Sequence, residues 1–75
     1  MITPAQCRAA RGLLSWKQRD LAAHSGVGYS TIRKFEAEET AARNSTLVVL
    51  RLTFEKAGVE FIDENGGGPG LRLRK

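Results

Sequence analysis

The sequence predicts a mainly α fold class, in which four or five short helices precede a short C-terminal β-hairpin. Apolar residues recur at helical spacing as far as Gly58, and cap and stop residues divide that segment into short helices. From Val59 the pattern changes to strand-like alternation. A chain of 75 residues has room for one small core. We therefore expect a helical domain over residues 1–58 and a hairpin extension over residues 59–75.

The first two helices have recognisable boundaries. Thr3 can cap the first helix through its hydroxyl, Pro4 suits the first turn, and the helix is expected to end near Leu13. The second helix is expected over residues 18–24, with Ser25 and Gly26 ending it.

Between Ser15 and Gln18 the sequence also fits a capping box, in which the glutamine folds back onto a serine cap. Lys17 directly precedes Gln18, where a Ser or Thr cap would be more usual.

The third and fourth helices follow from apolar spacing. A helix from Tyr29 to about Ala37 would bury Ile32 and Phe35 on one stripe. After a charged loop, Asn44 or Ser45 is expected to cap a fourth helix that ends at Gly58. The main stripe of this helix is Leu47, Leu50, Phe54 and Ala57. The additional apolar residues are Val48, Val49 and Leu52. They indicate either a helix buried on two sides or a surface for a second packing partner.

Two short strands are expected at the C-terminal end. Val59 and Phe61 fall on one face of the first strand, and Leu71 and Leu73 fall on one face of the second, with Arg72 and Arg74 opposite. Residues 63–70 are rich in glycine and predict the connecting turn. Because an isolated two-stranded hairpin is marginal in water, it must pack on the helices or pair with another chain.

Composition favours a polyanionic partner. Twelve Lys and Arg against eight Asp and Glu leave a net charge of +4 on a small surface. Cys7 is the only cysteine, which excludes an internal disulfide and a cysteine metal cluster, and we expect it in the core. No stretch approaches the roughly 20 apolar residues that span a bilayer. We expect a cytoplasmic protein with no membrane partner, metal or cofactor.

The sequence does not favour an enzyme. One His, one Cys and scattered carboxylates offer no nucleophile and base at a recognisable spacing. The glycines of residues 66–70 lack the strand-to-helix context of a phosphate-binding loop.

The segment QRDLAAHSGVGYSTIRKF, from Gln18 to Phe35, reads as two short helices joined by a tight turn. Ala22 is small where the helices must approach, and Gly26 stands where the turn commonly needs a positive φ. Together with its neighbours this segment resembles the Cro/CI-type, or xenobiotic-response-element, helix-turn-helix family of transcriptional regulators. The residues that carry the resemblance are Arg11, Leu14, Gln18, Leu21, Ala22, Gly26, Ser30, Thr31, Ile32, Phe35 and Glu36.

The resemblance implies a Cro/repressor-like domain whose second motif helix enters the major groove of double-stranded DNA. The residues expected to face the groove are Tyr29, Ser30, Thr31, Arg33 and Lys34. Arg33 would donate two parallel hydrogen bonds to guanine, and Lys34 would contact a base or a phosphate. Tyr29 would pack on a thymine methyl or a sugar, and Ser30 would contact a base or a phosphate.

Other residues are expected to hold the DNA backbone or the fold. By resemblance, Gln18 and the helix start beside it would bind phosphate, and Arg43 and Asn44 would form a second clamp on the DNA backbone. Lys17 departs from the family pattern, and its charge would add a phosphate contact. Arg11 and Glu36 would form a structural ion pair between the first and third helices.

Two functions remain open from the sequence. One is a bacterial or phage repressor that reads a palindromic operator as a homodimer. Its two copies would pair through the hairpin or, alternatively, through the fourth helix. The other is an antitoxin that binds a toxin protein and represses its own operon. A toxin-like reading frame next to this one would favour the second.

Overall fold

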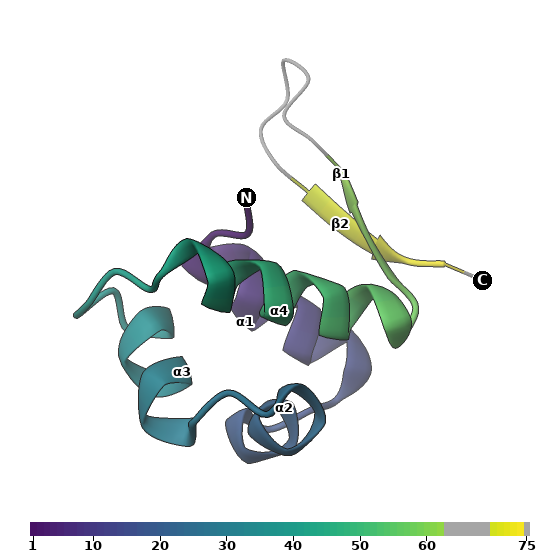
Figure 1. The fold of residues 1–75 in the computed structure, drawn as a ribbon. Helices are drawn as coiled ribbons and strands as arrows, with labels where there is room; N and C mark the ends of the chain where they lie inside the picture. The colour runs from purple at the N-terminus through teal and green to yellow at the C-terminus, as the bar shows by residue number, and fades with distance from the viewer. Residues whose placement is uncertain (63–69, 75) are drawn as a thin grey trace.

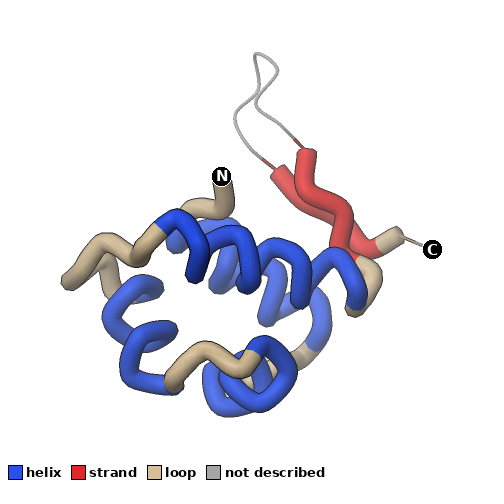
Figure 2. Tube along the Cα trace, viewed as in Figure 1, coloured by secondary structure: helices blue, strands red, loops and turns tan. Residues whose placement is uncertain are grey.

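The computed structural model describes residues 1–62 and 70–74. Within these residues the elements run in the order α1 (Pro4–Leu14), α2 (Gln18–Ser25), α3 (Tyr29–Glu36), α4 (Asn44–Lys56), β1 (Val59–Ile62) and β2 (Gly70–Leu73) (Figure 1). The hairpin projects beyond α1 and α4, on the side away from α3 (Figure 2). The predicted mainly α fold with a C-terminal hairpin is confirmed.

α1 begins as its sequence predicts. The Gln6 backbone N–H donates to the Thr3 hydroxyl over 3.1 Å, and the Thr3 N–H donates to the Gln6 side-chain oxygen over 3.0 Å. Pro4 occupies the first turn, where its missing N–H costs no hydrogen bond. The helix ends at Leu14, and Ser15 closes it in the left-handed region with φ 58°.

The start of α2 differs from the prediction. Ser15 is the C-terminal cap residue of α1 and does not cap α2, so the predicted capping box from Ser15 to Gln18 is wrong. Lys17 is the N-terminal cap residue, and its backbone N–H donates to the Asp20 carboxylate over 2.8 Å. At the other end, Gly26 takes φ 78° and donates its N–H to the carbonyl of Ala22, as expected for this turn.

α4 also begins one residue earlier than its predicted caps allow. Arg43 is the cap residue, and Asn44 and Ser45 lie within the first turn, so neither caps the helix. The helix ends at Lys56, and Gly58 turns the chain into β1 with φ 102°. Ala57 was expected on the buried stripe but is exposed, because it already belongs to the turn that ends the helix.

The hairpin completes the core. β1 and β2 pair antiparallel with Val59 opposite Leu73 and Phe61 opposite Leu71. Val59 and Phe61 are buried, which confirms the predicted alternation of β1, whereas Leu73 is 36% exposed. The turn expected over residues 63–70 lies, apart from Gly70, outside the described residues.

One apolar core joins the helices and the hairpin. Its buried members are Ile2, Cys7, Ala10, Leu21, Ile32, Phe35, Leu50, Phe54, Val59 and Phe61. Cys7 is fully buried, as expected. At the rim of the core, the Gln6 amide of α1 donates to the Gly70 carbonyl of β2 over 3.5 Å. Among the described residues, every helix is too short or too polar to cross a bilayer.

Candidate nucleic-acid interface

α2 and α3 are joined by residues 26–28, and α3 has two distinct faces. Ile32, Phe35 and Glu36 are buried. Ser30 and Lys34 are exposed, and at 100° per residue they lie opposite this buried stripe. The outward face of α3 is completed by Thr31 and Arg33, both exposed, on its two flanks. A helix held in the core by one face therefore presents two cations and two hydroxyls on the other.

Tyr29 is positioned differently from the expectation. Its side chain is half-buried and does not lie opposite Ile32 and Phe35. The guanidinium carbon of Arg19 lies 4.2 Å from the centre of the Tyr29 ring. Tyr29 lies on the flank of α3 that this arginine of α2 covers.

The described lysines and arginines divide into those that pair with a glutamate and those that do not, and the second group also includes Lys56 and Arg74, which lie outside α2 and α3. Four arginines lie within ion-pair distance of a glutamate: Arg8, Arg11, Arg51 and Arg72. Over residues 1–62 and 70–74, no ion pair engages the five cations of the α2–α3 segment and the start of α4, which are Lys17, Arg19, Arg33, Lys34 and Arg43. All five of these are exposed. This surface therefore carries positive charge that no carboxylate of residues 1–62 or 70–74 offsets by an ion pair.

At the start of α2, Gln18, one of the predicted phosphate-binding residues, contacts the buried carboxylate of Glu36. The Gln18 side-chain amide donates to Glu36 Oε1 over 3.0 Å, a contact that neither proposed role of Gln18 included. An amide nitrogen has two hydrogens, so one remains for another acceptor. Lys17 is exposed at the cap position beside it.

The start of α4 holds the other predicted clamp. Arg43 is the cap residue and Asn44 the first helical residue, and both are exposed. Thr31 and Lys34 line one hollow together with residues 40–42 of the loop before α4. The outward face of α3 is thus continuous with the segment that leads to Arg43.

Glu36 connects α3 to both preceding helices. Arg11 donates from Nε to Oε2 and from Nη2 to Oε1, each over 2.7 Å, and Arg8 donates to the Glu36 backbone carbonyl. The Cys7 thiol donates to Oε2 over 3.1 Å. The resemblance to the family predicted the partner Arg11, whereas the contacts of Arg8, Cys7 and Gln18 were missed because neither the resemblance nor any local pattern pointed to them.

The buried network shifts the pKa values of Glu36 and Cys7, and also that of Arg11, whose pKa is raised by its hydrogen bond to Glu36. Burial opposes ionisation of Glu36, but hydrogen bonds from Arg11, Gln18 and Cys7 outweigh it, so the Glu36 pKa lies below its ordinary value. Burial, together with the hydrogen bond to Glu36, raises the pKa of the Cys7 thiol far above its ordinary value. Glu36 is therefore a carboxylate and Cys7 a thiol at neutral pH.

Two short helices joined by a tight turn, with exposed cations on the outward face of the second, are the arrangement of a helix-turn-helix domain. A family model described as helix-turn-helix matches residues 8–57, which is most of the chain. The chain belongs to this family of Cro/CI-type DNA-binding transcription regulators. A search among curated proteins finds no match to it. The described residues contain no group of three or more His, Cys, Asp or Glu side chains placed to hold a metal ion.

Proposed function

We propose that this protein is a transcriptional repressor that reads a palindromic operator as a homodimer, with α3 of each copy in the major groove. The observation that carries the proposal is the outward face of α3. Its cations, Arg33 and Lys34, are exposed and unpaired by any described carboxylate, while Ile32 and Phe35 fix the opposite face in the core.

The base-reading residues follow from their chemistry and position. Arg33 is the main candidate, because a guanidinium can donate bidentately to O6 and N7 of guanine. Lys34 lies opposite the buried stripe and contacts a base or a phosphate, and Ser30 and Thr31 contribute short hydroxyls beside it. Tyr29 is half-buried, so its part in this proposal is to pack at the edge of the groove.

Two clamps hold the DNA backbone in this proposal. Lys17 and Gln18 at the start of α2 bind one phosphate, using the second amide hydrogen of Gln18 and the free backbone N–H groups of the helix start. Arg43 and Asn44 at the start of α4 bind another. Such contacts set the register of α3 without reading sequence.

The α4 apolar face, formed by Val48, Val49 and Leu52, is our proposed dimer surface. These side chains are 51%, 39% and 49% exposed. Exchange of the hairpin strands is less favourable, since Val59 and Phe61 are buried in the core and would have to leave it. Recognition of a full operator needs a dimer, because one recognition helix contacts only a few base pairs and a symmetric pair of helices reads a palindrome.

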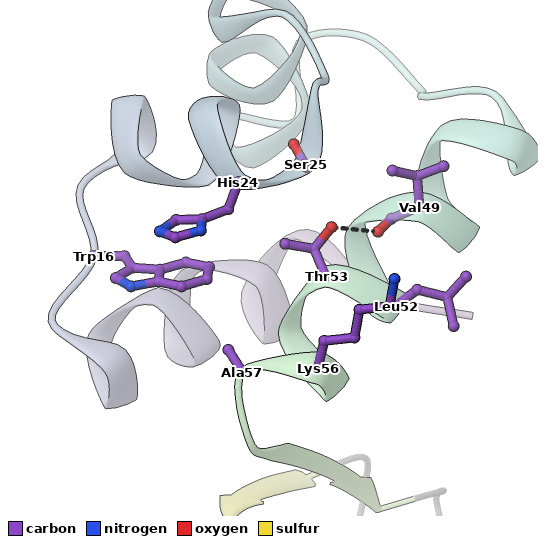
Figure 3. A pocket seen from close by; sticks show the side chains of 8 residues that line it. All are labelled: Trp16, His24, Ser25, Val49, Leu52, Thr53, Lys56 and Ala57. Carbon is purple, nitrogen blue, oxygen red and sulfur yellow. Dashed lines mark hydrogen bonds between the residues drawn. The ribbon is translucent and has the colours of Figure 1, made fainter.

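An antitoxin is the second candidate function. The α4 apolar face borders a hollow that lies between α4 and the end of α2 (Figure 3). The rings of Trp16 and His24 stack at 4.3 Å on one side of it, and Leu52 and Lys56 of α4 lie on the other. A toxin segment could occupy this surface instead of a second copy. Co-purification with the product of an adjacent toxin-like gene would favour this function over the repressor.

The experiment that tests the proposal is selection of bound sequences from random duplex DNA. A sequence-reading homodimer enriches a palindrome whose two half-sites are about one helical turn apart. If no sequence is enriched and all binding disappears with added salt, the chain binds DNA without reading it and the repressor proposal fails.

A further inference from the structure

Arg19 and Tyr29 form a contact between the first turn of α2 and the first residue of α3. The Arg19 guanidinium lies over the Tyr29 ring at 4.2 Å, within the range of cation–π attraction. Arg19 is itself one of the five exposed cations of this surface that pair with no described carboxylate. None of the roles proposed above uses Arg19.

The stacked geometry leaves the hydrogen-bonding capacity of Arg19 unused. A guanidinium stacks through its face, while its five N–H donors point along its edges. Within residues 1–62 and 70–74, the side chain of Arg19 makes no hydrogen bond or ion pair, and the residue is exposed. Arg51 gives the contrast, because it also lies over a ring, that of Phe61, but its Nε donates to Glu55 over 3.0 Å.

We propose that Arg19 contacts a DNA phosphate and that Tyr29 is the positioning residue that holds its guanidinium for that contact. The inference rests on the proposed function. In a helix-turn-helix the first motif helix spans the DNA backbone, so a free donor on α2 meets phosphate rather than a base edge. Tyr29 therefore acts on the phosphate contact through Arg19, and the base-reading role proposed for Arg33 does not depend on it.

The test uses the full chain, the duplex obtained by selection, and an unrelated duplex of equal length. Arg19→Ala is expected to weaken binding to both duplexes by the same factor and to reduce the salt slope by about 1. Arg19→Lys keeps the charge but loses the stacked, planar fork, and is expected to lie between wild type and Arg19→Ala. Arg74→Ala, which removes an exposed arginine from the chain after β2, is the matched control and should leave binding unchanged.

The role of Tyr29 is tested with a double-mutant cycle. Tyr29→Phe keeps the ring and should preserve the salt slope, whereas Tyr29→Ala should reduce it. Arg19→Ala should cost less in the Tyr29→Ala background than in wild type, because the two residues act as one unit. Thermal unfolding of each variant shows whether a loss of binding reflects a loss of folding.

The outcomes separate this inference from the proposed function. If wild type enriches no sequence, the repressor proposal fails, and the effect of Arg19→Ala on binding to the unrelated duplex still decides whether Arg19 contacts phosphate. If wild type reads an operator and Arg19→Ala binds it with unchanged affinity and salt slope, only the inference is overturned. A change confined to one base pair would also overturn it, since Arg19 would then read a base.

Discussion

Glu36 is a buried carboxylate, 3% exposed, that accepts hydrogen bonds from side chains of two other helices. Arg11 and Cys7 contact it from α1, and Gln18 contacts it from α2. The last turn of α3 is therefore fixed in direction relative to both. Because the outward face of α3 depends on this direction, Glu36 supports the DNA-binding surface without belonging to it.

Arg11→Ala is expected to lower the free energy of unfolding by about 3 kcal/mol, because it leaves the buried Glu36 charge without its main partner. Arg72→Ala is the matched control, since it breaks an ion pair with Glu60 in which both side chains are exposed. Urea unfolding at neutral pH should show a large loss for the first variant and little change for the second. Equal losses would contradict the structural role of the buried pair.

The lowered pKa of Glu36 makes part of the stability depend on pH. Its carboxylate contributes stability above the ordinary glutamate pKa of about 4.3, and this contribution is lost as pH falls through the lower pKa of the folded state. Glu36→Gln should reduce stability at neutral pH and flatten its decline on acidification. Urea unfolding of wild type and variant from neutral pH to below pH 4 measures both effects. An unchanged acid dependence in the variant would show that other groups cause the decline.

At the scale of single elements, a glycine-to-alanine substitution can be compared at a helical position, Gly12, and at a left-handed position, Gly26. A Cβ on Gly12 or Gly26 would meet no neighbour within 4 Å, so packing does not distinguish them. Gly12 lies within α1, where alanine should stabilise by roughly 0.5–1 kcal/mol. Gly26 has φ 78°, where alanine should destabilise by roughly 1–2 kcal/mol. Opposite shifts in Tm are expected, and shifts of the same sign would contradict this assignment of the turn.

The periodicity of the apolar residues predicted each element because core burial imposes it. Ile32 and Phe35 of α3 and Leu50 and Phe54 of α4 are buried as their spacing indicates. The caps were less predictable, since several polar residues near a helix start compete for the same N–H groups. Ser15 caps the C-terminus of α1 instead of the start of α2. At the start of α2 the Lys17 N–H donates to the carboxylate of Asp20, the third residue of that helix.

At the scale of the whole molecule, contacts between distant residues limited what the sequence could predict about the site. Family resemblance led to the Arg11–Glu36 pair, and the structure places these side chains 2.7 Å apart. The contact of Gln18 with Glu36 and that of Arg19 with Tyr29 depend on how α2 and α3 cross. No local pattern encodes that crossing, and the DNA-contacting roles remain predictions.

Assembly of two copies is predicted to depend on α4. Leu52→Lys places a charge in the α4 apolar face and should yield a monomer in sedimentation equilibrium, with Leu73→Lys on the hairpin as the matched control. Leu52 and Leu73 are 49% and 36% exposed, so both variants should remain folded. A monomer caused by Leu73→Lys alone would move the interface to the hairpin.

The measurement that tests the central claim most directly is the affinity of wild type, Arg33→Ala and Arg74→Ala for the selected operator and for every single-base change in one half-site. If the outward face of α3 reads DNA, Arg33→Ala loses about 1–3 kcal/mol and its preference at one base pair, while Arg74→Ala keeps the full pattern. If Arg33→Ala weakens binding equally at every sequence, or no more than Arg74→Ala does, α3 does not read bases through Arg33 and the account is wrong.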